Sequence, residues 1–151
     1  MLKFRLTKEV DVRISKQFLR KRVDRLEQVL KKRLEKMLLG RDGEIELVFI
    51  NDRTIQAMNK EYRSKDKPTD VISFAYMEVT DYEKTVGDIM VGDIFISIDT
   101  ATAQAEEKGH SWKKEVEILF VHGMLHCLGF DHNNDEEEAE MEGWAEKILR
   151  D

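Results

Sequence analysis

Three histidines near the C-terminal end of the sequence have the spacing of metal ligands. His122, His126 and His132 are three of the four histidines in the 151-residue chain, and they fall within eleven residues. On a helix, His122 and His126 would lie one turn apart on the same face, so both rings can reach one ion. Gly129 favours a helix end where the chain turns back, which would bring His132 to the same point. Three neutral imidazoles favour zinc and leave a fourth coordination position open, as in reactive rather than structural zinc sites.

One residue inside this segment argues against proteolysis. The spacing matches the metzincin protease pattern H-E-x-x-H-x-x-G-x-x-H at every position but one. Gly123 stands where those proteases have the glutamate that accepts a proton from water, and glycine has no proton acceptor. We therefore expect a metal cage that lacks the general base of these proteases.

The elements that position the histidines can be predicted from hydrophobic periodicity and capping residues. The histidine helix is expected from Trp112 to about Leu128, with Ser111 as its N-cap and Gly129 at its end. Further strands are expected over residues 2–6, 44–50, 71–76 and 92–98, and further helices over residues 14–38, from the N-caps Asp52 and Asp99, and after Asp135. This order predicts an α+β fold, a single domain over residues 1–151 in which helices cover a small mixed β-sheet.

Composition favours a cytoplasmic protein. The single cysteine, Cys127, excludes an intramolecular disulfide and suits a reducing compartment. The charged N-terminal residues have no apolar core of a signal peptide. The most apolar stretch, residues 118–130, is too short for a membrane span and contains two histidines.

Charge is distributed unevenly along the chain. The net charge is −6, yet residues 13–36 contain ten Lys or Arg and only three acids. This basic segment, with a net charge of +7, could contact phosphate even on an acidic protein, or it could be an ordinary solvated helix face. The sequence leaves both interpretations open.

Three motifs together resemble one known family. The first is the histidine segment, residues 122–132, which reads His-Gly-x-Leu-His-x-x-Gly-Phe-Asp-His. The second runs from Met58 to Phe74 and includes Tyr62-Arg63 and Lys67-Pro68-Thr69-Asp70-Val71-Ile72-Ser73. The third is Gly92-Asp93-Ile94-Phe95-Ile96-Ser97. Along the chain, over roughly residues 44–145, the three motifs occur in the order expected for the YbeY family of bacterial metal-dependent endoribonucleases, and together they resemble that family.

The resemblance implies a zincin-like fold and a function in RNA processing. It implies that the chain cleaves single-stranded RNA, acts in ribosomal RNA maturation, notably at the 3′ end of the small-subunit RNA, and takes part in ribosome quality control. Its partners would be ribosomal RNA and the ribosome or its proteins, with no DNA and no membrane. One zinc ion would be bound by His122, His126 and His132, and Arg63 would be important for activity.

The roles of these residues can be stated as hypotheses. The metal would polarise a phosphoryl oxygen, activate water, or both, and the planar guanidinium of Arg63 suits the charge of a phosphorane-like transition state. The general base stays unassigned. Asp131 is expected to orient a histidine or cap the turn, and Asp70 and Asp93 are weaker candidates. Two alternatives stay open: a metallopeptidase-like hydrolase with a displaced base, and a non-catalytic ribosome-associated factor stabilised by zinc.

Overall fold

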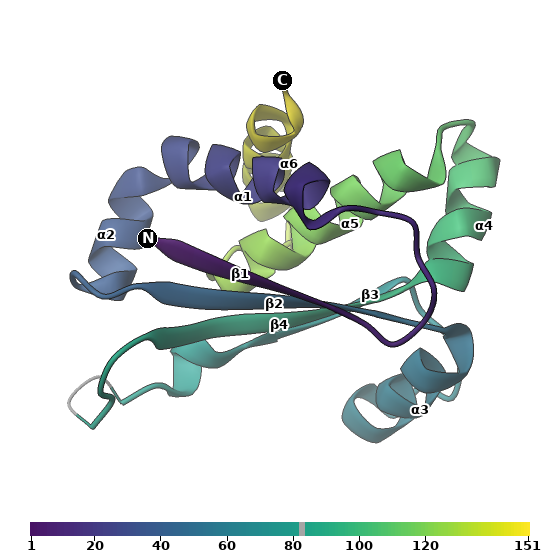
Figure 1. Cartoon of the computed structure of the whole chain (residues 1–151), viewed down its shortest axis with the longest axis horizontal. Helices are drawn as coiled ribbons and strands as arrows, with labels where there is room; N and C mark the ends of the chain where they lie inside the picture. The colour runs from purple at the N-terminus through teal and green to yellow at the C-terminus, as the bar shows by residue number, and fades with distance from the viewer. Residues whose placement is uncertain (82–83) are drawn as a thin grey trace.

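A computed structural model describes residues 1–81 and 84–151. Within these residues, four strands form one sheet with the spatial order β1-β2-β4-β3 (Figure 1). Strands β1, β2 and β4 are parallel, and β3 pairs antiparallel with β4 at one edge. The mixed sheet predicted from the sequence is therefore confirmed. The strands span Leu2–Lys8 (β1), Gly43–Ile50 (β2), Val71–Ala75 (β3) and Ile89–Ser97 (β4).

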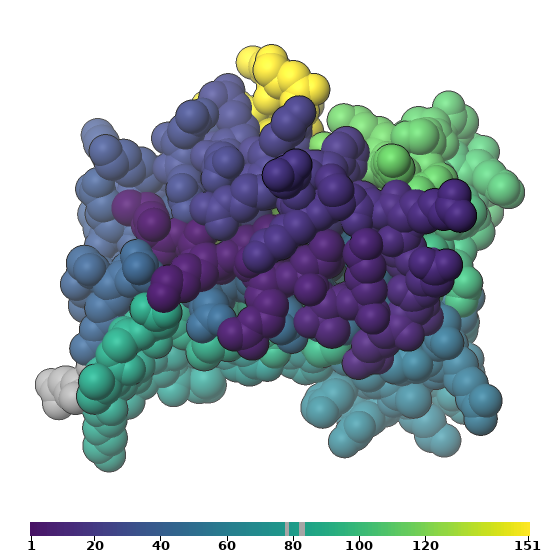
Figure 2. Space-filling view, viewed as in Figure 1, coloured from purple at the N-terminus to yellow at the C-terminus, as the bar shows by residue number. Residues whose placement is uncertain are grey.

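Helices cover both faces of this sheet, as expected for an α+β fold (Figure 1). Helices α1, α5 and α6 lie over one face, α3 lies on the opposite face, and α4 lies at the end of the sheet where β4 finishes. Figure 2 shows that the N-terminal segment, with β1 and the start of α1, covers the middle of one side of the molecule. The helices span Lys16–Val29 (α1), Lys31–Leu38 (α2), Asp52–Arg63 (α3), Ile98–Lys108 (α4), Trp112–Cys127 (α5) and Asp135–Leu149 (α6), and a 3-10 turn, η1, spans Tyr76–Val79.

The main core lies between the sheet and helices α1, α5 and α6. Its buried side chains come from β1, β2 and β4 and from α1, α2, α4, α5 and α6, together with the segments that flank them. A smaller cluster, Val48, Ile50, Ile55 and Ile72, fills the space under α3. This arrangement supports a single domain over residues 1–151, which stays a prediction. No helix in the described part of the chain is long and apolar enough to cross a membrane.

The long helix predicted over residues 14–38 is wrong, because the chain forms two helices with a break at Leu30. Leu30 has φ −115° and ψ 25°, outside the helical range. In an unbroken helix, the four-residue steps through Leu26, Leu30, Leu34 and Leu38 would rotate the side chains by about 40° per step. The break keeps all four leucines in the core.

Two predicted helix caps are also wrong. Asn51 caps α3 and Ser97 caps α4, each accepting a hydrogen bond from a backbone N–H three residues later. The aspartates instead connect the two helices. Asp52 accepts hydrogen bonds from the hydroxyls of Ser97 and Thr100, and Asp99 accepts one from the backbone N–H of Asp52.

Candidate active site

Helix α5 begins and ends as its sequence predicts. Ser111 accepts a hydrogen bond from the backbone N–H of Lys114, and Leu128 is the C-cap. Gly129 follows with φ +93°, a conformation that glycine adopts without strain. The backbone N–H of Phe130 donates a hydrogen bond to the carbonyl of Leu125. The chain therefore reverses direction directly after the helix that carries two of the three histidines.

The three predicted ligand histidines line one cavity. His122 and His126 project from α5, and His132 comes from the loop after the reversal. The rings of His126 and His132 lie 5.1 Å apart between centroids and meet edge to face at 73°. Nδ1 of His126 lies 3.0 Å from the carbonyl oxygen of Phe130. Because a carbonyl only accepts, Nδ1 carries the proton and Nε2 is the nitrogen free to bind a metal.

Both α5 histidines are held in the neutral form, which is the form that binds metal. Burial lowers the pKa of His122, against the opposing influence of the Ile118 carbonyl and of two carboxylates. Burial, followed by the nearby His132 ring, also lowers the pKa of His126. The donor chemistry therefore fits a zinc-like ion. Among residues 1–81 and 84–151, however, no three His, Cys, Asp or Glu side chains converge closely enough for one ion, so the three-histidine cage stays a prediction.

The cavity is large enough for a nucleotide-sized substrate. Its volume is about 960 Å³, at the upper end of the range for small-molecule sites. The histidines form one wall, and Arg63, the last residue of α3, reaches the same space. The remaining polar and aromatic lining comes from Asp70, Ser73, Phe74, Tyr76, Phe130, Asp131, Glu138 and Glu142.

Arg63 is brought to the cavity by the structured end of α3. Ser64 ends this helix with φ +59°. The side-chain amide of Asn59, a buried residue, donates to the carbonyl of Lys67 at 2.9 Å, and the backbone N–H of Lys65 returns to the carbonyl of Asn59. These bonds fix the loop between α3 and β3. Arg63 and the three histidines line the same cavity, and the catalytic role of Arg63 stays a prediction.

The aspartates proposed from the sequence have different roles. Asp131 accepts hydrogen bonds from the backbone N–H of His132 and from the Asn133 side chain, and the first of these holds its pKa below the usual range. Of its two predicted roles, the structure shows the turn cap. Asp93 accepts a hydrogen bond from the hydroxyl of Tyr76 at 2.8 Å, and it does not line the cavity. Asp70 does line it, and caps the start of β3 through the backbone N–H of Val71.

Two acidic residues of the cavity wall were missed by sequence analysis. Glu138 and Glu142 lie on α6 and line the cavity together with Met141. Their four-residue spacing places both on one helix face. That spacing was visible in the sequence, but the acidic run around Glu138 hid which of its members face inward.

Close approach of α5 to the sheet explains Gly123. A Cβ at this position would lie 2.7 Å from Cγ2 of Ile94 and 3.1 Å from Oγ of Ser73. Position 123 therefore faces the sheet and has no room for a glutamate. Gly92 on β4 also allows α5 to pack closely on the sheet, because a Cβ there would collide with Cys127 and with the carbonyl of Phe74. Cys127 is buried as predicted, and burial raises its pKa to about 12.

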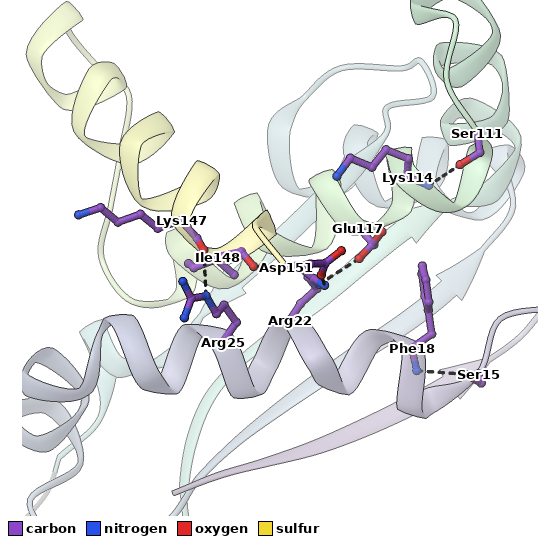
Figure 3. Close-up of polar contacts among 10 residues, drawn as sticks. All are labelled: Ser15, Phe18, Arg22, Arg25, Ser111, Lys114, Glu117, Lys147, Ile148 and Asp151. Atoms are coloured by element: carbon purple, nitrogen blue, oxygen red, sulfur yellow. Dashed lines mark hydrogen bonds and ion pairs between the residues drawn. The ribbon is translucent and has the colours of Figure 1, made fainter.

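Two arginines of the basic segment, Arg22 and Arg25, have a structural role. Arg22 is buried, with Nε 3.0 Å from Oε2 of Glu117 and Nη1 donating to the carbonyl of Ile148 (Figure 3). Its guanidinium also pairs with Asp151. Arg25 donates to the carbonyl of Lys147 on α6. These contacts join α1 to α5 and α6 and do not depend on any ligand.

Arg33 connects the basic segment to the candidate site. Its Nε donates to the carbonyl of Leu128 at 3.0 Å, and its guanidinium lies 4.0 Å from the centre of the Phe130 ring. Leu128 and Phe130 flank the glycine at which the chain reverses, and the Phe130 carbonyl orients His126. Arg33 is therefore a positioning residue for the histidine loop.

Comparison with known proteins agrees with these observations. Residues 7–151 match the sequence model of the family described as Endoribonuclease YbeY. An Endoribonuclease YbeY from Heliobacterium modesticaldum is 50% identical over 116 residues, which cover 72% of this chain and 69% of the relative. One from Bacillus cereus is 41% identical over 128 residues, covering 82% of each chain. The solution structure of TM1509 from Thermotoga maritima superposes with a TM-score of 0.59 at 22% identity, covering 97% of this chain and 89% of that one. This last likeness concerns the fold alone.

Proposed function

Because the chain belongs to the Endoribonuclease YbeY family, we propose that it is a zinc-dependent endoribonuclease specific for single-stranded RNA. Family membership makes it a hydrolase that cleaves phosphodiester bonds in RNA and has a role in ribosomal RNA processing. The finer proposal is that it acts in the cytoplasm on the 3′ end of small-subunit ribosomal RNA and in ribosome quality control. The observation that carries the proposal is the meeting of the three histidines and Arg63 in one cavity.

The histidines would hold the metal ion. His122 and His126 are kept neutral by burial, and the carbonyl of Phe130 presents Nε2 of His126 as the ligand atom. His132 lies beside His126 on a loop held by Arg33 and Asp131. A bound zinc ion would supply Lewis acidity toward a phosphoryl oxygen and would lower the pKa of water.

Arg63 would bind the scissile phosphate and stabilise the charge that develops in the transition state. Among the described residues that line the cavity, it alone has a Lys or Arg side chain. The same wall includes Asp70, Asp131, Glu138 and Glu142, which repel a polyanion. The guanidinium and the bound ion must therefore together offset this repulsion.

Two of these carboxylates are placed to receive a proton. Glu142 and Asp70 both line the cavity, and their charges act on His122 to raise its pKa. Asp70 already accepts a hydrogen bond from the backbone of Val71. We propose Glu142 as the general base, because it lines the cavity that the histidines also line and its charge acts on His122.

The test separates catalysis from stabilisation by metal. Arg63→Ala should retain zinc, measured by elemental analysis, and should cleave single-stranded RNA about 10²- to 10³-fold more slowly, as for loss of one transition-state donor. Arg53→Ala, an exposed arginine on the same helix that lies outside the cavity wall, is the matched control and should cleave at the wild-type rate. His126→Ala should lose both zinc and cleavage.

Three results would contradict the proposal. Wild-type cleavage by zinc-loaded Arg63→Ala would remove the assigned role of Arg63. Zinc retained at full occupancy in His126→Ala would contradict the ligand set. A folded, zinc-loaded wild-type protein that cleaves no single-stranded RNA would favour the non-catalytic alternative.

A further inference from the structure

An exposed aromatic ring stands beside the candidate site. Tyr62 precedes Arg63 in the last turn of α3, and 60% of its surface is exposed. Large aromatic side chains are normally buried in folded proteins because they gain most from leaving water. A single exposed ring needs no explanation by itself, but the surroundings of this one are ordered and specific.

Tyr62 is held in place by the aromatic wall of the cavity. Its ring meets that of Phe74 edge to face, with 5.1 Å between centroids and 77° between planes. Phe74 in turn meets Phe95 at 5.8 Å and 85°. Phe74 and Tyr76 both line the cavity. The edge-to-face contact restricts the ring of Tyr62 while 60% of its surface stays exposed, so a ligand that binds the ring costs less side-chain freedom than it would on an isolated ring.

The neighbouring groups indicate what this ring would bind. Arg63, the next residue, lines the cavity where a phosphate would lie. In an RNA single strand, each phosphate is followed within one nucleotide by an unpaired base whose flat face is accessible. Aromatic side chains bind such faces regardless of base identity, whereas bases in a duplex are already stacked and paired. The guanidinium of Arg63 therefore suits the phosphate of an unpaired nucleotide, and the ring of Tyr62, the residue before it, suits the base.

We propose that Tyr62, backed by Phe74, forms a nucleobase-stacking subsite next to the phosphate position at Arg63. This inference rests on the proposed function, since it assumes an RNA substrate. It gives a physical reason for preferring single strands, because a duplex cannot place a base on Tyr62 without unstacking it. The subsite binds substrate and does not take part in the chemical step.

The experiment compares Tyr62→Ala and Tyr62→Phe on two RNAs. Binding of the zinc-loaded protein to a short single-stranded RNA is measured by fluorescence anisotropy, and again with the same sugar–phosphate chain lacking all bases. Tyr62→Ala should bind the ordinary RNA about 5- to 150-fold more weakly, the range for loss of one stacked base. Tyr62→Phe, which retains the ring, should bind as the wild type does. The abasic chain should bind the wild type and Tyr62→Ala equally.

A fluorescent base provides a direct reading of the contact. 2-Aminopurine in the RNA should be quenched on binding to the wild type and Tyr62→Phe, and much less on binding to Tyr62→Ala. Val86→Ala is the control for loss of an exposed apolar side chain, since Val86 is 92% exposed and lies outside the cavity wall. It should change neither reading.

Different results would refute this inference and the proposed function. If the wild type binds and cleaves RNA while Tyr62→Ala binds it equally well, the subsite is wrong and the endoribonuclease proposal stands. An equal loss on ordinary and abasic chains would also overturn stacking. If the wild type neither binds nor cleaves RNA, the proposed function fails first. Should Tyr62→Ala prove unstable on heating, Tyr62→Leu against Tyr62→Phe gives the same comparison.

Discussion

The buried ion pair between Arg22 and Glu117 allows a quantitative test of how α1 is held to the rest of the molecule. The two side chains are 5% and 12% exposed, with Nε and Oε2 3.0 Å apart. Burial raises the pKa of Glu117, and the charge of Arg22 opposes this rise. Arg22→Met keeps an unbranched apolar stem but removes the countercharge and the donor to Ile148.

The magnitude follows from leaving one buried charge without its partner. Breaking a buried pair in this way costs about 3–5 kcal/mol. We expect a loss near the lower limit, about 3 kcal/mol at pH 7, because Glu117 keeps some contact with water. For a chain of this length, such a loss lowers the melting temperature by about 6–12 °C. Arg20→Met is the control: Arg20 is more exposed and pairs with Asp24, so its loss should stay below about 1 kcal/mol.

The pH dependence has a definite sign. The folded-state pKa of Glu117 lies above its ordinary value of 4.5, so the ionised carboxylate opposes folding at neutral pH. Removing Arg22 raises this pKa further. As pH falls below the raised folded-state pKa toward 4.5, Glu117 takes up a proton in the folded state, and the deficit of Arg22→Met relative to wild type should shrink.

Urea denaturation followed by circular dichroism between pH 5 and 8 measures both effects. Glu117→Gln in the Arg22→Met background should recover part of the lost stability at pH 7, because it removes the unpaired charge. A deficit below about 1 kcal/mol at pH 7 would refute the assignment of a buried pair. A deficit that grows on acidification would refute the electrostatic explanation.

Three further predictions concern the site and the basic segment. Arg33→Met loses both the donor to Leu128 and the guanidinium over Phe130, and it should lower zinc affinity about tenfold, as for loss of a group that orients a ligand; a metal titration that matches the wild type would contradict this. Gly123→Glu should lose at least about 3 kcal/mol in urea denaturation, because the side chain has no space against the sheet, and peptide hydrolysis by the folded variant would contradict our interpretation. Replacing Lys21, exposed in the basic segment, and Lys114, exposed on α5, with Glu should weaken RNA binding and reduce its salt dependence, and unchanged binding would make the surface around these two lysines an ordinary solvated face.

The histidine helix could be predicted because its signals are local. Ser111 caps it, and Gly129 allows the left-handed conformation that ends it. The four-residue step between His122 and His126 fixes their common face without reference to the rest of the chain. The strand pattern of the mixed sheet was also local, since each strand alternates or runs apolar over a few residues.

The parts that could not be predicted depend on contacts between distant residues. Arg22 donates a hydrogen bond to the carbonyl of Ile148, which is 126 residues away in the sequence. Arg33 donates one to the carbonyl of Leu128, which is 95 residues away. Nothing near either arginine in sequence distinguishes it from the solvated lysines beside it. For the same reason, the inward-facing Glu138 and Glu142 could not be separated from the acidic run that surrounds them.

The two sides of α5 explain why this zincin-like helix does not carry a protease glutamate. His122 and His126 line the cavity, whereas Gly123 and Cys127, each one residue further on, pack against β3 and β4. Consecutive helical positions differ by about 100°, so a side chain at position 123 must meet Ile94 before it can reach the metal side. The absence of a glutamate is thus a consequence of how closely α5 packs on the sheet. A base for phosphodiester cleavage therefore cannot come from position 123, and our proposal assigns that role to Glu142 on α6, which lines the same cavity as the histidines.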